Sequence, residues 1–185
     1  MKKRVEVPIG KRESQTLEFK SADALKNPFT ISREVVAMLN AGGGEIWIGL
    51  SEQHGVATAA ENIADPERAK VDLLNHLIET IEPPLTDEVQ IETREVESTT
   101  LLWIGVGDVR AGPPFALKKD KALQFFIRVD HRVRPLTHAE LFSSTKTGGD
   151  DNARLLRGTR DEIVKRRKPL LWIGAIPARH RGRAS

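Results

Sequence analysis

The sequence of 185 residues contains no cysteine and no tyrosine. Without cysteine, the chain can form no disulfide, no thiolate zinc site and no cysteine nucleophile. Aromatic residues make up only 5% of the chain, so few side chains are available for stacking on nucleic-acid bases. No apolar run approaches the roughly 20 residues that span a bilayer, and no apolar signal core follows the basic N-terminus. We therefore expect a globular, cytoplasmic protein with no membrane partner.

The net charge of +3 is distributed unevenly along the chain. Residues 154–185 hold ten of the 29 basic residues and two of the 26 acidic ones, which leaves 19 basic and 24 acidic residues before Arg154. A basic tail on a mildly acidic body favours a polyanionic partner. A tail that serves only solubility is an equally good interpretation.

The first third of the chain predicts a strand, a helix and a second strand. Alternation predicts a strand over residues 16–20 with Glu18 and Lys20 facing solvent. A helix capped by Thr30 or Ser32 should follow and end at three glycines, residues 42–44. The apolar run 45–50 then predicts a central strand. Since the glycines follow a helix and precede a strand, we interpret them as a structural turn and not as a phosphate-binding loop.

The remaining pattern alternates helices and strands. Asp65-Pro66 predicts a helix start, with Val71, Leu74, Ile78 and Ile81 on its buried stripe. Further elements are strands over 88–97, 100–109 and 123–129, a short helix opened by Thr137…Glu140, and two short helices over 150–157 and 159–168. This order predicts an α+β (mixed α/β) fold with a mixed sheet and flanking helices over residues 1–147, and a helical, basic C-terminal extension over 148–185.

Two early segments together resemble a known family. They read Glu13-Ser14-x-x-Leu17-Glu18-Phe19-Lys20 and Ala37-x-x-Asn40-x-x-Gly43-Gly44-x-Ile46-x-Ile48-Gly49-Leu50. The later segments Pro113-Pro114-Phe115, Phe125–Val129, Arg134-Pro135 and Glu140-Leu141 fit the same pattern. Over about residues 10–145, the chain resembles the Schlafen AlbA-type (AlbA_2) domain.

The resemblance implies two different activities. Prokaryotic members are described as DNA-binding domains, often attached to transcription-regulator modules. Animal Schlafen proteins include endoribonucleases that cleave transfer RNA through three carboxylates, two of which match Glu13 and Glu18. The third position falls near Ser51-Glu52, where Glu52 stands in place of the expected aspartate. The zinc ligands of the family are missing, because this chain has no cysteine.

The three glutamates Glu13, Glu18 and Glu52 are candidate catalytic residues and metal ligands. An odd offset places Glu13 and Glu18 on opposite faces of a straight strand, so they meet only if the chain turns between them. Three carboxylates that meet can hold Mg²⁺ or Mn²⁺ and activate water for phosphodiester cleavage. The alternative is that they are surface charges. No cofactor is certain from the residues alone.

Clusters of basic residues are the better indication of binding. Such clusters contact phosphates without reading base sequence. The candidates are Lys20, Lys118, Lys119, Lys121, Arg128, Arg132 and Arg134 in the body, and Arg179, Arg181 and Arg183 in the extension.

The leading interpretation is a nucleic-acid-binding domain, with DNA favoured and RNA an open alternative, acting in transcriptional regulation or defence. The second is a metal-dependent endoribonuclease that acts on tRNA-like RNA, and the third is a protein-interaction module of a larger assembly. The sequence leaves open whether the protein forms a homo-oligomer.

Overall fold

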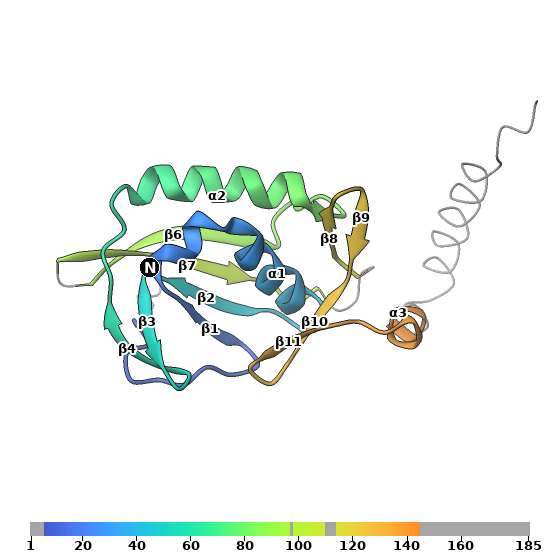
Figure 1. Cartoon of the computed structure of the whole chain (residues 1–185), viewed down its shortest axis with the longest axis horizontal. Helices are drawn as coiled ribbons and strands as arrows, with labels where there is room; N and C mark the ends of the chain where they lie inside the picture. Colours follow the sequence, from blue (N-terminus) through green and yellow to red (C-terminus); the bar gives the residue numbers. More distant parts are fainter. Residues whose placement is uncertain (1–5, 97, 110–113, 145–185) are drawn as a thin grey trace, which may run out of the picture. The chain divides into compact units, whose positions relative to one another are not determined.

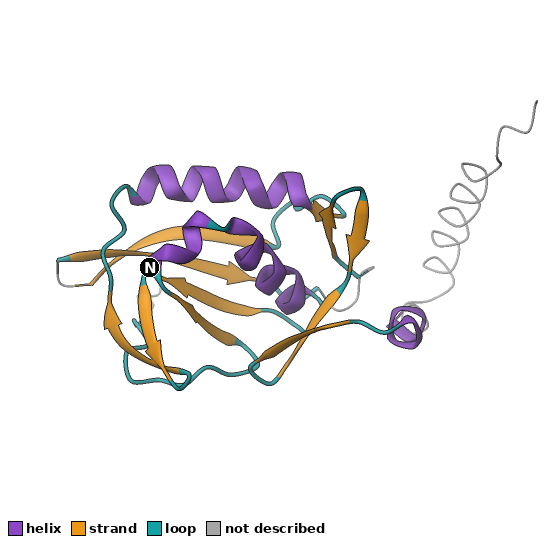
Figure 2. Cartoon of the chain, in the orientation of Figure 1, coloured by secondary structure: helices purple, strands orange, loops and turns teal. Residues whose placement is uncertain are grey.

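A computed structural model describes residues 6–96, 98–109 and 114–144 (Figure 1). Its centre is a mixed four-stranded sheet with the order β1-β2-β7-β6, in which β1 and β2 are parallel and the other neighbours antiparallel. The combination of this sheet with separate helices (Figure 2) confirms the predicted α+β class. The four strands are β1 (Leu17–Lys20), β2 (Gly44–Ile48), β6 (Val89–Val96) and β7 (Thr99–Val106).

One face of this sheet packs against two helices, α1 (Pro28–Leu39) and α2 (Pro66–Thr80). Ile46 and Ile104 from the sheet are buried with Val35 of α1 and Leu77 of α2. The α2 helix begins as predicted, because the side chain of Asp65 accepts a hydrogen bond from the Arg68 backbone N–H at 3.1 Å. This helix-covered face holds the larger of the two hydrophobic clusters.

The opposite face packs against a hairpin of β3 (Leu50–Gln53) and β4 (Val56–Ala60). Phe19, Trp47 and Leu101 are buried there with Leu50 of the hairpin. The predicted single strand over 45–50 is in fact two, since Gly49 lies between β2 and β3 with φ +94°. A side chain at residue 49 would also meet Leu101 Cδ2 at 2.8 Å, so the break depends on glycine.

Three smaller units complete the described part of the chain. A three-stranded sheet combines β5 (Ile81–Glu82), β8 (Ala116–Lys119) and β9 (Ala122–Gln124), and a hairpin pairs β10 (Phe126–Val129) with β11 (Arg132–Pro135). The predicted strand over 123–129 is therefore split at Phe125. The short helix α3 (His138–Ser144) has the predicted capping box, with Glu140 N–H donating to Thr137 Oγ1 and Thr137 N–H donating to Glu140 Oε2.

Asn40, at the C-terminal end of α1, forms hydrogen bonds with the backbone of two of these smaller units. Its Nδ2 donates to the backbone carbonyls of Phe115 and Phe126 at 2.8 Å each, and its Oδ1 accepts from the Phe115 N–H at 2.8 Å. One amide side chain thus satisfies three backbone groups in β10 and in the residue that precedes β8. It fixes both strands relative to the helix.

Two helix predictions were wrong in detail. Helix α1 begins at Pro28 after Asn27, and neither Thr30 nor Ser32 caps it; both hydroxyls donate to backbone carbonyls of the preceding turn. In α2 most of the predicted buried stripe faces solvent, with Val71 54% and Ile78 49% exposed, whereas Ile81 at the C-cap is buried as predicted. The sheet instead buries the neighbouring stripe, which includes Leu73 and Leu77.

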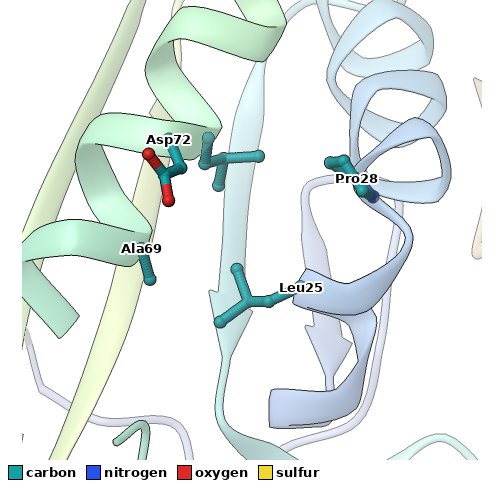
Figure 3. A pocket seen from close by; sticks show the side chains of 5 residues that line it. Leu25, Pro28, Ala69 and Asp72 are labelled. Atoms are coloured by element: carbon teal, nitrogen blue, oxygen red, sulfur yellow. The ribbon is translucent and has the colours of Figure 1, made fainter. Parts of the chain in front are cut away.

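A small cavity of about 190 Å³ separates the 3-10 helix η1 (Ala22–Lys26) and α1 from α2. Figure 3 shows Leu25 on one side of it and Ala69 and Asp72 of α2 on the other. Its lining is mostly apolar, so it offers little to a charged ligand.

The predicted helices over 150–157 and 159–168 lie outside the described residues, as do Arg179, Arg181 and Arg183. The division into a body and a basic extension at residues 147 and 148 stays a prediction. Within the described ranges, no helix is both long and apolar enough to cross a membrane.

Candidate functional site

The three predicted glutamates line one open depression of about 450 Å³. Glu13 and Glu18 come from the segment that enters and forms β1, and Glu52 comes from β3. The Glu13 N–H donates to Gly55 O at 2.7 Å, which ties the first segment to the β3–β4 turn. A fourth carboxylate, Glu61, also lines the depression. The chain thus brings together residues that are up to 48 positions apart, from Glu13 to Glu61.

Glu18 is buried, which corrects the prediction that it faces solvent. It is 4% exposed and pairs in register with Ile46 of β2, so its side chain lies on the helix-covered face of the sheet. Both of its carboxylate oxygens are occupied: Oε2 accepts from Arg128 Nη2 at 2.6 Å, and Oε1 forms an ion pair with Lys20. Lys20 is thus part of an internal ion pair.

Arg128 holds the acidic segment in place. Its side chain is fully buried, and Nη1 donates to Glu34 Oε2 of α1 at 2.9 Å. Its Nε donates to Ser14 O at 3.0 Å and its Nη2 to Leu17 O at 3.2 Å, in addition to the contact with Glu18. The planar guanidinium therefore satisfies two carboxylates and two backbone carbonyls from two segments, the β1 segment and α1. Its burial argues against the phosphate-contacting role predicted for it.

Glu34 is the second acid of this buried network. Burial raises its pKa and the charge of Glu18 raises it further, while Lys20, Arg128 and Arg33 lower it. Two carboxylates beside one guanidinium repel each other, so each depends on the cations between them. Ion pairs therefore connect β1, α1 and β10 through a buried network of Glu18, Glu34, Arg128 and Lys20.

Glu13 lines the depression, and the pKa of its carboxyl group is raised. Burial raises its pKa, and the charges of Glu18 and Glu52 raise it as well, whereas the hydrogen bond from the Phe19 N–H to Glu13 Oε1 at 3.2 Å lowers it. The charges of Glu18 and Glu52 thus act on the same carboxyl group.

The arrangement does not fit the divalent ion that the resemblance implies. Among the residues that the structure describes, no group of three or more acidic or histidine side chains is placed to hold a metal ion. Glu18 is committed to Arg128 and Lys20, and Glu52 Oε2 accepts from the Gly55 N–H. A Mg²⁺ or Mn²⁺ ion requires several free oxygen ligands. We derive no metal-dependent step from these residues.

The raised pKa of Glu13 predicts a pH dependence of stability. The folded protein binds the Glu13 proton more tightly than the unfolded chain, so this group lowers the free energy of unfolding as pH rises above the ordinary value of 4.5. Replacing Glu13 by Gln removes the ionisation and should stabilise the protein more at pH 7 than at pH 4, as urea denaturation at both values will show. Glu95→Gln, on an exposed position of β6, is the control for a change in total charge. An equal effect of the two variants at both pH values would contradict the prediction.

Some of the predicted basic residues pair with carboxylates, and others are exposed without such a partner in the described part of the chain. Lys118, Lys119 and Lys121 are exposed on the β8–β9 hairpin, and Arg132 is exposed at the start of β11. Arg134 donates to Glu140 Oε1 and Oε2, so its charge is already compensated. The β8–β9 hairpin therefore carries three exposed candidate cations within a few residues of one another.

Sequence reasoning missed Glu34 and Glu61. Glu34 carried a signal, because it lies within the helical stripe of Ile31, Val35 and Met38, where a charge needs a buried partner. Glu61 carried none: it follows β4 and reaches the depression by accepting from the Ala22 N–H at 3.0 Å and from the Ser51 hydroxyl.

The geometry defines a class of domain, in which a mixed sheet carries helices on one face and an acidic segment is locked by a buried arginine. The family model described as Schlafen, AlbA_2 matches residues 13–137. The chain therefore belongs to the Schlafen AlbA_2 family. A search of the curated proteins gave no match.

Two solved structures are similar to this chain. The N-terminal domain of a protein from Nitrosomonas europaea, described as related to the ATP-dependent DNA helicase RecG, matches with a TM-score of 0.50 and 21% identity over 68% of this chain and 87% of that one. The DIP2311 protein from Corynebacterium diphtheriae matches with a TM-score of 0.49 and 17% identity over 71% of this chain and 24% of that one. The first similarity supports the fold.

Proposed function

We propose that this chain is a nucleic-acid-binding domain, with DNA as the favoured partner, that contacts the phosphate backbone through the β8–β9 hairpin. The observation that carries the proposal is the set of exposed lysines Lys118, Lys119 and Lys121 on this one hairpin. None of these lysines forms an ion pair with another residue in the described part of the chain. Ammonium groups without a carboxylate partner can bind phosphates, and the counterions released on binding favour the complex.

Two further points support this choice of surface. The prokaryotic members that the chain resembles are described as DNA-binding domains, and the chain belongs to their family. The depression with Glu13, Glu18, Glu52 and Glu61 holds four carboxylates and one lysine, so it would repel phosphates. The arginines of the extension, Arg179, Arg181 and Arg183, are proposed to add to the binding without being essential for the contact at the hairpin.

The test is the salt dependence of binding to duplex DNA, measured by fluorescence anisotropy with two unrelated sequences. We expect similar affinities for both sequences, and the double variant Lys118→Gln/Lys121→Gln should bind roughly ten-fold more weakly, with a log–log salt slope shallower by about 2. Arg68→Gln/Lys70→Gln is the matched control, because these α2 residues lose the same charge and already pair with Asp72 and Glu67. A wild-type slope near zero would remove the proposal.

A cleavage assay with transfer RNA distinguishes a binding domain from an endoribonuclease. Transfer RNA incubated with the protein in Mn²⁺ should remain intact, as it should with a chelator, because Glu18 is committed to its two cations. Cleavage that requires Mn²⁺ and disappears in Glu13→Gln would instead favour the endoribonuclease.

A further inference from the structure

A groove of about 260 Å³ lies between the first half of α1 and the strands β8, β9 and β10. Phe29 and Phe126 give it aromatic walls, and Arg33 and Lys119 give it two cations. Phe29 and Arg33 are four residues apart in α1 and so lie on the same face of the helix. Aromatic rings with cations beside them form the combination that recognises single strands of nucleic acid.

The two cations of the groove are available to a phosphate. The Arg33 side chain is 50% exposed, and within the described residues its ionic contact is a long one, 3.8 Å from Nη2 to Glu34 Oε1. Lys119 Nζ lies 5.7 Å from the centre of the Phe29 ring, where it makes a cation–π contact. Lys119 therefore covers the ring in the free protein and has no carboxylate partner among the described residues.

We propose that this groove binds one unpaired nucleotide of a nucleic-acid strand. The base stacks against Phe29 and Phe126, and its phosphate lies between Arg33 and Lys119. The phosphate draws the Lys119 ammonium away from the Phe29 ring, which frees the ring face for the base. This inference rests on the proposed function and extends it from backbone contact to a preference for single strands.

The size and polarity of the groove suit a single base. Its volume is below the roughly 300 Å³ at which pockets for drug-sized ligands begin. Asn27 and Gln124 also line the groove, and a side-chain amide offers both donors and acceptors to the edge of a base. A paired base offers no free face, because its neighbours in the duplex cover it. The groove therefore distinguishes unpaired from paired nucleotides.

The test compares short single strands of thymidine or uridine with a duplex of the same length, by fluorescence anisotropy at fixed salt. We expect the wild type to bind both single strands more tightly than the duplex. Tighter binding of the thymidine strand would identify DNA as the preferred nucleic acid, and tighter binding of the uridine strand would identify RNA. Phe29→Leu, which keeps an apolar side chain at the same half-buried position, should weaken single-strand binding about ten-fold and leave duplex binding unchanged.

Lys118 and Lys119 provide the matched pair of controls. They are adjacent in β8 and so point to opposite sides, and only Lys119 lines the groove. Both variants to Gln lose one charge, so both should weaken duplex binding alike, but Lys119→Gln should lose more single-strand affinity than Lys118→Gln. This comparison also decides the question if Phe29→Leu does not fold.

Two outcomes overturn the inference, and they differ in what else they overturn. If the wild type binds duplex with the expected salt dependence but shows no preference for single strands, or if both lysine variants lose single-strand affinity equally, only the groove proposal is wrong. If the wild type binds neither single strands nor duplex, the proposed function is wrong as well.

Discussion

Replacing Arg128 by Met should lower the free energy of unfolding by about 3–5 kcal/mol at neutral pH. The substitution keeps an unbranched apolar stem but removes the guanidinium from between Glu18 and Glu34, which are 4% and 5% exposed. Lys20 then remains paired with Glu18 in the described structure. Glu34 keeps only two longer contacts there, 3.8 Å from Oε1 to Lys20 Nζ and 3.8 Å from Oε1 to Arg33 Nη2. Urea denaturation at pH 7 measures the loss.

The pH dependence of this loss identifies its cause. Burial and the charge of Glu18 raise the pKa of Glu34, and Arg128 is one of the cations that lower it. Without Arg128, Glu34 should take up a proton more readily in the folded state, so the difference between variant and wild type should shrink as pH falls. The triple variant Glu18→Gln/Glu34→Gln/Arg128→Met removes the uncompensated charges and should recover part of the stability.

The matched control is Arg132→Met, on the neighbouring strand β11, where the arginine is exposed. This variant should change the free energy of unfolding by no more than about 0.5 kcal/mol. If Arg128→Met is as stable as Arg132→Met, the buried network does not hold β1, α1 and β10 together. A lowered salt slope of DNA binding in Arg128→Met, measured where this variant is folded, would restore the phosphate-contacting role.

Local features of the fold were predictable from the sequence because their causes lie within a few residues. Asp65-Pro66 and the pair Thr137 and Glu140 start helices through hydrogen bonds across one turn. The predicted strands over 88–97 and 100–109 correspond to β6 and β7, which pair from Val89 with Val106 to Val96 with Thr99.

Features that depend on distant partners were not predictable from local patterns. Arg128 and Glu18 are 110 positions apart, and an arginine in a strand that ends in a turn reads as a surface residue until its acid partners are known. Helix α2 has apolar residues on two adjacent stripes, and only the position of the sheet selects Leu73 over Val71. The family resemblance identified Glu13, Glu18 and Glu52 as candidates. Only the structure shows that their carboxylates already bind cations or backbone N–H groups.

Replacing Gly43 by Ala should lower the free energy of unfolding by about 3 kcal/mol, because backbone strain and a steric clash add together. Gly43 has φ +86°, and a Cβ there would lie 2.6 Å from the Val106 carbonyl oxygen and 2.9 Å from the Gly107 carbonyl carbon. Both contacts are with backbone, which cannot rotate away as a side chain does. Thermal and urea denaturation at neutral pH measure the loss.

Gly10→Ala is a control that separates the two causes of this loss. Gly10 has a similar φ of +80° but nothing within 4 Å of the added Cβ, so it should show the strain alone, about 1 kcal/mol. Gly43 ends α1 through its N–H bond to Met38 O at 2.8 Å and leads directly into β2, beside which β1 carries Glu18. Equal losses in the two variants would show that the left-handed conformation, and not the close approach of β7, requires glycine at this turn.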